Sequence, residues 1–216
     1  MLSVIMRRIY KCTAPHSLVK TKKSCGNEWG KVPENVKDLW RNQLIKEQEG
    51  FDAYTEEILP PNDKKTIHID HFKKRAHHPE LTYDWDNLFL ANHHHNNAYG
   101  ADAKDNGTSK IQKNRYSDLI HPAKEDPHDY FTYNLRGEIL PREGLDKAML
   151  KRAQFTIDTF CLNSPALLQK RNGILGVLRS YKDQMAEVYV DLKECPFLSL
   201  IDCYKQEKWW TLEGMR

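Results

Sequence analysis

The 216-residue chain contains little cysteine and no long apolar run, and each shortage excludes a class of protein. Its five cysteines are scattered and none belongs to a C-x-x-C pair, so the sequence indicates neither a disulfide framework nor a cysteine zinc knuckle. No apolar stretch approaches the roughly 18–20 residues that cross a bilayer. We therefore expect a soluble globular protein of the reducing cytoplasm, without a membrane partner.

Acidic residues are absent from the first 27 positions, which carry six Lys and Arg residues before Glu28. A basic segment of this kind attracts nucleic-acid phosphates, because each neutralised phosphate releases counterions. The alternative interpretation is a solvated, partly mobile terminus. The net charge of the whole chain is only +3, so it is the distribution of charge that carries information.

The sequence predicts an α+β fold in three parts: a basic segment at 1–30, a core at 31–107 and a mainly helical region at 108–216. The last part begins with a β-hairpin over 130–140 that turns at 134–137. Ser164-Pro165 is a typical helix start, with Ser at the N-cap and Pro at the first helical position. Apolar stripes in the helices of this part either fill the protein's own core or dock a partner.

The core reads as a helix, a hairpin and a further short helical stretch. Apolar residues at i, i+3, i+4 and i+8 predict a helix over Pro33–Glu49. Two short apolar runs, Thr66–Ile69 and Asn87–Leu90, are typical of paired strands. The polar segment from about His93 to Lys104 has room for one or two helical turns.

The chemistry-bearing residues cluster in this core. Hydrolysis of a phosphodiester needs a base to deprotonate water and a hard cation to hold the phosphate oxygens. Asp70 and His71 are adjacent at a strand end, so a bend there aims the carboxylate at a metal and the imidazole at a water. Asn96 offers a second oxygen ligand, and the Asn87 amide is placed to brace the loop that carries His71. Such oxygen ligands suit Mg²⁺ or Mn²⁺.

Each piece has a plainer interpretation when it is taken alone. Asn87 is more often a strand-edge or turn residue, His93–His95 is a solvated run, and Asn96-Asn97 is a helix cap. The order and spacing of Asp-His, then Asn-Leu-Phe, then His-Asn-Asn favour the catalytic interpretation over these.

This pattern resembles the HNH (ββα-metal) endonucleases, and more narrowly the PtuB-like HNH nucleases of retron and Septu-type antiphage systems. The resemblance implies that His71 is the general base, that Asp70 and Asn96 bind the metal, and that Asn87 is the middle Asn of the signature. It extends beyond the core through the segments 6–11, 44–50, 68–72, 83–89, 126–133 and 162–171.

The resemblance also implies a biological role. We expect an endonuclease acting on DNA or on structured RNA such as tRNA, as the effector of a defence system and beside an ATPase subunit. In a retron, a reverse transcriptase and its DNA–RNA product would be further partners. Two alternatives remain: a non-catalytic nucleic-acid-binding or scaffolding subunit that keeps the HNH fold, and a His-rich zinc protein without nuclease function.

The sequence departs from its apparent relatives where they carry two C-x-x-C pairs for a structural zinc. The equivalent positions are Asp52, Thr55, Asn92 and His95, of which only His95 is a strong zinc ligand. We therefore expect no structural zinc, and a pocket closed by hydrogen bonds among these four residues. The alternative is a zinc held by another set drawn from His77, His78, His93 and His94.

A second departure places Tyr99 where relatives often carry a lysine. Phosphate contacts must then come from other cations near the core. The candidates by proximity are Lys73, Lys74, Arg75 and Lys104.

Overall fold

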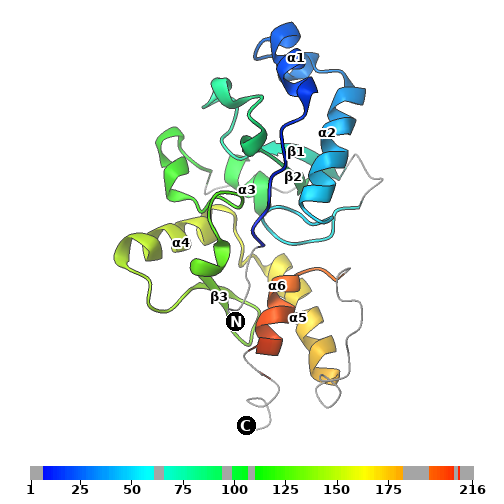
Figure 1. Ribbon diagram of the computed structural model, residues 1–216. Coiled ribbons are helices and arrows are strands. Elements are labelled where there is room, and N and C mark those ends of the chain that lie inside the picture. The colour runs from blue at the N-terminus through cyan, green and yellow to red at the C-terminus, as the bar shows by residue number, and fades with distance from the viewer. Residues whose placement is uncertain are drawn as a thin grey trace.

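The computed structural model describes residues 7–60, 66–93, 99–106, 110–181, 195–206 and 209. Within these residues the fold is α+β, with helices arranged around two small antiparallel sheets (Figure 1). Among the described helices, none combines the length and the apolar character needed to cross a membrane.

A two-stranded hairpin lies at the centre of the predicted core. Strand β1 (Ile67–His71) pairs antiparallel with β2 (Leu88–Asn92), so that Asp70 lies opposite Phe89 and His71 opposite Leu88. Alternate residues of a strand point to opposite faces. Leu88 and Leu90 accordingly join one apolar cluster, while Phe89 joins the other. The hairpin is therefore covered on both sides, and this fixes the strand end that carries Asp70 and His71.

One face of the hairpin packs against helix α2 (Glu34–Glu47). Trp40 and Leu44 of this helix are fully buried in the same apolar cluster as Ile67 and Ile69. The predicted helical periodicity therefore corresponds to a real buried stripe, and the helix ends within two residues of the expected position.

The other face belongs to a larger cluster shared with the C-terminal region. Here lie β3 (Phe131–Tyr133), β4 (Ile139–Pro141), α4 (Lys147–Thr159), α5 (Pro165–Ser180) and α6 (Leu198–Gln206). The expected hairpin and the Ser164 cap are both present, since the Ser164 hydroxyl accepts a hydrogen bond from the Leu167 N–H. Most apolar residues of these helices are buried in this cluster, while Leu150 of α4 and Val177 of α5 are exposed.

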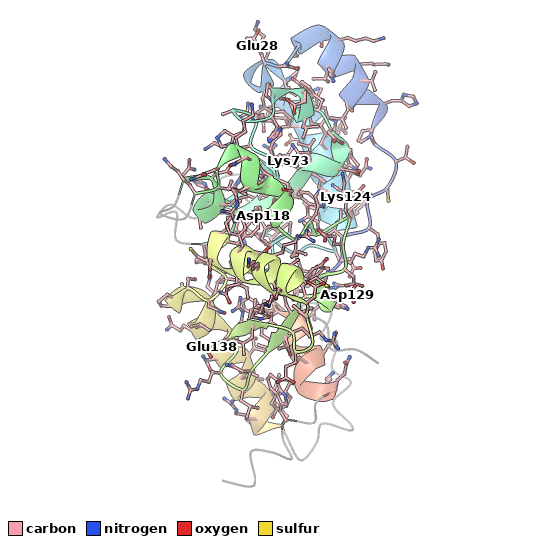
Figure 2. All side chains as sticks on the ribbon, turned by 90° about the vertical axis from the view of Figure 1, so that its left-hand side faces the viewer. Glu28, Lys73, Asp118, Lys124, Asp129 and Glu138 are labelled. Carbon is pink, nitrogen blue, oxygen red and sulfur yellow. The ribbon has the colours of Figure 1, made fainter. Side chains whose placement is uncertain are left out.

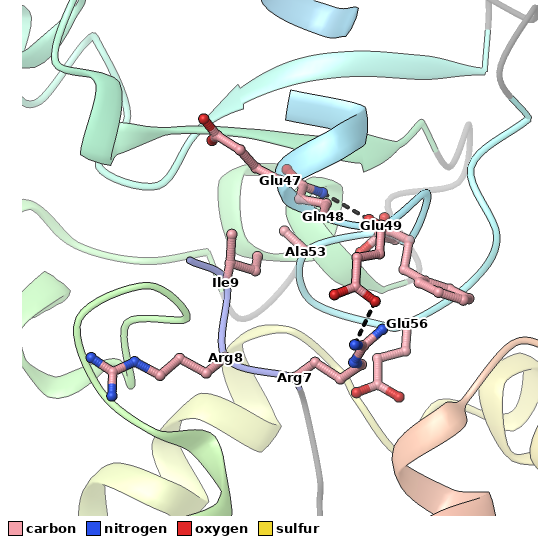
Figure 3. A pocket seen from close by; sticks show the side chains of 10 residues that line it. Arg7, Arg8, Ile9, Glu47, Gln48, Glu49, Ala53 and Glu56 are labelled. Atoms are coloured by element: carbon pink, nitrogen blue, oxygen red, sulfur yellow. Dashed lines mark hydrogen bonds and ion pairs between the residues drawn. The ribbon is translucent and has the colours of Figure 1, made fainter. Parts of the chain in front are cut away.

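The N-terminal segment packs on the core and is not a loose arm. Helix α1 (His16–Cys25) buries Leu18 and Thr21, and the Trp40 indole donates to the Ser17 hydroxyl at 2.8 Å. Figure 3 shows the stretch Arg7–Ile9 against the loop that follows α2, with the Arg7 guanidinium 2.5 Å from the Glu49 carboxylate. The interpretation as a mobile terminus is therefore wrong for residues 7–31.

Lys11 shows how closely this segment is integrated. Its ammonium donates to the Leu88 carbonyl at 2.7 Å, pairs with Glu47 at 3.3 Å and lies 4.5 Å from the centre of the Trp85 ring. Burial lowers the pKa of Lys11 to about 8. One of the six basic residues is thus a structural cation that ties the segment to the hairpin.

Helix α3 (Gly100–Asn106) packs against β2 and completes the order β1, β2, α3 along the chain. Its first residue, Gly100, has φ +66°, a backbone conformation that glycine adopts without strain. Five of its residues, Gly100 to Lys104, are buried, so this short helix is held by the core on one side and by strand β1 on the other.

Candidate active site

A cavity of about 740 Å³ opens beside strand β1 and collects most of the predicted site. Asp70, His71, Lys74 and Arg75 line it, together with His68 from the same strand. Other segments contribute Asn27, His93, Asp102, Asp105 and Asn106. The cavity therefore brings together the proposed base, one proposed metal ligand and two of the four proposed phosphate-binding cations.

His71 is held in one orientation by the backbone. Its Nε2 lies 3.0 Å from the Thr82 carbonyl oxygen, which can only accept, so Nε2 carries the hydrogen and Nδ1 keeps a lone pair. The Trp29 ring packs edge-on against the imidazole, with centroids 4.6 Å apart. Burial lowers the pKa of His71 to about 4, so the ring is neutral at physiological pH. The side chain is thus a fixed, neutral acceptor.

Asp70 is buried and shares one oxygen between two donors. Its Oδ2 accepts from the Tyr54 hydroxyl at 2.5 Å and from the Lys104 ammonium at 2.7 Å. Burial by itself would raise the pKa of Asp70, but the charges of Lys104 and His68 and the hydrogen bonds from Lys104 and Tyr54 together outweigh it and hold that pKa below its usual value. No described residue donates to Oδ1, so this oxygen is left for a ligand in the cavity.

Lys104 takes a different role from the one expected. Its ammonium is fully buried and also donates to the carbonyl oxygens of His71 at 2.8 Å and Phe72 at 3.2 Å. All three of its protons are therefore engaged within the protein. The prediction of a phosphate contact by Lys104 is not supported, because the side chain is committed to Asp70 and to the end of β1.

Asn87 lies in the 3₁₀ turn Trp85–Asn87, directly before β2 and not on the strand as expected. Its amide nitrogen donates to the carbonyl oxygens of Lys73 at 3.1 Å and Leu81 at 3.2 Å, and its oxygen accepts from the Lys73 N–H at 2.7 Å. The amide thereby joins both ends of the loop between His71 and Thr82. This loop supplies the carbonyl that orients His71, so Asn87 occupies the bracing position that the sequence suggested.

The other proposed phosphate-binding residues divide between two cavities. Lys74 and Arg75 line the cavity with His71, and the Arg75 guanidinium lies 5.7 Å from the Trp29 ring centre. The Lys74 ammonium donates to the Asp105 carbonyl at 3.0 Å. Lys73 instead lines a separate cavity of about 380 Å³ on the side of Asn87.

The positions equivalent to the zinc-binding pairs are joined by one carboxylate. Asp52 accepts from the Thr55 N–H at 2.9 Å with Oδ1 and from the Asn92 N–H at 2.7 Å with Oδ2. Burial raises the pKa of Asp52 to about 6. Two segments that are 40 residues apart are thus connected without any of the thiolates that a zinc site of this type uses.

Two of the predicted residues, Asn96 and His95, lie outside the described residues, as does His94. The remaining histidines of the alternative zinc set point to separate partners: His77 to the Tyr116 hydroxyl, His78 to Glu80 and His93 to Asp102. Within the described ranges, no three His, Cys, Asp or Glu side chains gather closely enough to hold a metal ion.

Sequence reasoning missed three contributors to the site. Tyr54 and Thr82 contact Asp70 and His71 from loops that are distant in sequence, and no local pattern announces such contacts. His68 is different, because it precedes Asp70 by two residues and so shares its strand face. That period of two could have identified it as a cavity residue.

Comparison with known proteins adds no relative. Neither a protein-family model nor a curated protein matches the chain. The assignment of a function therefore depends on the residues and the geometry described above.

Proposed function

We propose that the protein is a metal-dependent endonuclease of the HNH type, which hydrolyses nucleic-acid phosphodiester bonds with His71 as general base. The observation that carries this proposal is the pairing of two uncommitted acceptors in one cavity. The hydrogen bond to Thr82 leaves Nδ1 of His71 basic, and the two donors on Oδ2 leave Oδ1 of Asp70 open. The order β1, β2, α3 is that expected for a ββα core.

The environment of His71 keeps its lone pair available at neutral pH, because burial holds the imidazole neutral above about pH 4. The same lowered pKa makes the ring a weaker base than an exposed histidine, so the proposal requires that the attacking water be made more acidic, which a bound cation would do. When Nδ1 takes the proton, the Thr82 carbonyl on the opposite nitrogen stabilises the imidazolium that forms. Trp29 and the braced loop keep the ring from turning away.

Within the described residues, one oxygen of this site is open to a divalent cation. Asp70 Oδ1 is a hard oxygen without a described donor, and carboxylate and amide oxygens are the ligands that Mg²⁺ and Mn²⁺ prefer. Asp70 and Asn96 are the residues that would hold it. Bound there, the ion would supply charge stabilisation to the phosphate oxygens. Hydrogen bonds from Lys104 and Tyr54 hold the Asp70 carboxylate in position.

The role in antiphage defence with an ATPase partner is part of this proposal and depends on the sequence resemblance. So do the retron reverse transcriptase and its DNA–RNA product as further partners, and a cytoplasmic location. The C-terminal helices bury most of their apolar residues in the protein's own core, but Leu150 and Val177 are exposed, so a docking role for this region stays part of the proposal.

The test is a cleavage assay on a panel of DNA and RNA substrates with Mg²⁺, with Mn²⁺ and with chelator. We expect His71→Ala to lose about 100-fold or more of the wild-type rate. His128→Ala is the matched control, since His128 lies in the turn Pro127–Asp129 and does not line the cavity. Equal cleavage rates for His71→Ala and wild type would refute His71 as the general base, and no cleavage by the wild type with either metal would favour the non-catalytic scaffold.

A further inference from the structure

Helix α1 presents a basic surface that the catalytic proposal does not use. Lys20, Lys22 and Lys23 are all exposed, and no ion pair within the described residues engages them. Lys20 and Lys23 are three residues apart and so lie on neighbouring positions of the helix surface. No acidic residue precedes Glu28 that could neutralise them.

This basic surface is rigidly positioned. Leu18 and Thr21 anchor α1 in the apolar cluster under α2, and Ser17 accepts the hydrogen bond from Trp40. The lysines are therefore carried by a fixed helix. In Figure 2, Glu28 and this helix lie at the upper end of the molecule, above Lys73 and the loop that follows β1.

The surface continues into the active-site cavity. Asn27, two residues beyond α1, lines the cavity, and Trp29 contacts His71 on one side and the Arg75 guanidinium on the other. Arg75 is exposed and has no acidic partner among the described residues. The intervening acid, Glu28, is paired with Lys31 at 2.7 Å. Lys20, Lys22 and Lys23 lie in the half of α1 that is nearer to Asn27, with Lys22 on a different side of the helix from Lys20. Cations thus extend from the cavity along this half of α1.

We infer that Arg75, stacked on Trp29, and Lys20, Lys22 and Lys23 of α1 form one phosphate-binding track for the substrate strand that extends from the cleavage site. This inference rests on the proposed function. From Lys20 to Lys23 the helix rises by about 4.5 Å, which adds one to two nucleotides of a duplex strand at about 3.4 Å each to the length between the cavity and α1. The substrate must then extend by at least that length on one side of the scissile phosphate.

A nucleic-acid strand fits this surface better than a lipid surface does. A helix that lies in a membrane interface buries a broad apolar face. Val19 is the one exposed large apolar side chain of α1, since Leu18 faces the core. Charge without apolar area is typical of phosphate-backbone contacts.

The test measures binding apart from cleavage, using full-length protein that carries His71→Ala. Affinity for a labelled oligonucleotide is followed by fluorescence anisotropy across a salt series. We expect the added triple change Lys20→Gln, Lys22→Gln and Lys23→Gln to make the slope of log K against log salt shallower by about 2 to 3, because each lost phosphate contact contributes about 0.7–0.9. Affinity at low salt should fall at least tenfold.

The matched control is Lys110→Gln, Lys147→Gln and Lys151→Gln, which removes the same charge from exposed positions outside the track. Its slope should stay within one unit of the parent. Equal changes in both triple variants, or binding to anionic phosphatidylserine vesicles without binding to the oligonucleotide, would overturn the track. The two proposals fail in different ways. If the α1 triple variant shows the expected shallower salt slope but the wild type cleaves no substrate, the nuclease proposal is refuted. If the wild type cleaves but the triple variant keeps the salt slope of its parent, the track is refuted.

Discussion

The Lys104 ammonium lies 2.7 Å from Oδ2 of Asp70, and neither side chain has appreciable contact with solvent. The pair joins helix α3 to the end of strand β1, where Asp70 and His71 stand side by side. Further hydrogen bonds from Lys104 to the His71 and Phe72 carbonyls fix the backbone at this bend. One buried cation therefore sets the position of both catalytic candidates.

Replacing this cation should destabilise the fold strongly. Lys104→Met keeps the length of the side chain but leaves Asp70 buried without its counter-charge, which costs about 3–5 kcal/mol at neutral pH. In the wild type the pKa of Asp70 is lower in the folded state than in the unfolded state. The ion pair therefore stabilises the fold fully at pH values above the unfolded-state pKa, and this stabilisation is lost as the pH falls through the folded-state pKa. Urea unfolding at pH 7 measures the difference.

In Lys104→Met the pKa of Asp70 should instead rise. The difference in unfolding free energy between the variant and the wild type should therefore shrink as acid protonates the carboxyl. Lys151→Met, at an exposed position, serves as the control and should change the unfolding free energy little. A loss below about 1 kcal/mol in Lys104→Met would show that the ion pair does not organise the site.

The Asn87 amide should be needed for both stability and turnover. Asn87→Ala removes three hydrogen bonds to the loop between His71 and Thr82, at about 1 kcal/mol each. We expect a loss of about 2–3 kcal/mol in unfolding free energy and a lower cleavage rate at a temperature where the variant stays folded.

Asn172→Ala provides the comparison for Asn87, because the Asn172 amide also donates to two carbonyls but lies exposed on α5. It should lose less stability and no activity. Full activity of folded Asn87→Ala would refute the bracing role.

Two buried histidines should lower the stability of the fold in mild acid, while the raised pKa of Asp52, about 6, acts in the opposite direction in the same range. Burial lowers the pKa of both His71 and His121 to about 4. Between about pH 6.5 and pH 4 the unfolded chain therefore binds protons that the folded chain excludes, and stability falls on acidification by up to about 1.4 kcal/mol per pH unit for each histidine.

Urea titrations at several pH values in this window measure that slope. His121→Gln removes one of the two groups, so its stability should depend less steeply on pH than that of the wild type. An identical slope in variant and wild type would show that His121 is not held neutral by the fold.

Local patterns in the sequence predicted most of the elements. The short apolar run Thr66–Ile69, the helical spacing of Trp40 and Leu44, and the Ser164 cap each act within a few residues, and all three elements are present. Helix α1 was missed because its buried face consists of only Leu18 and Thr21, too few apolar positions to produce a periodic signal.

The candidate site was predicted in part for the same reason. Asp70 and His71 are neighbours, and Asn87 precedes an apolar strand, so short-range spacing identified them. The contacts of Tyr54, Thr82 and Lys104 join residues 11 to 34 positions apart, and only folding defines them. Lys104 was proposed as a phosphate contact from its charge and its proximity to the core, because sequence does not reveal that an ammonium is fully buried.

The most direct test of the account is chemical rescue of the missing base. In His71→Gly the imidazole ring is removed, and we predict that cleavage falls about 100-fold or more and is partly restored by added imidazole. Asp70→Ala, which lacks the carboxylate but keeps the base, should gain nothing from imidazole. Cleavage by His71→Gly at the wild-type rate without imidazole would contradict the assignment of His71 as the general base.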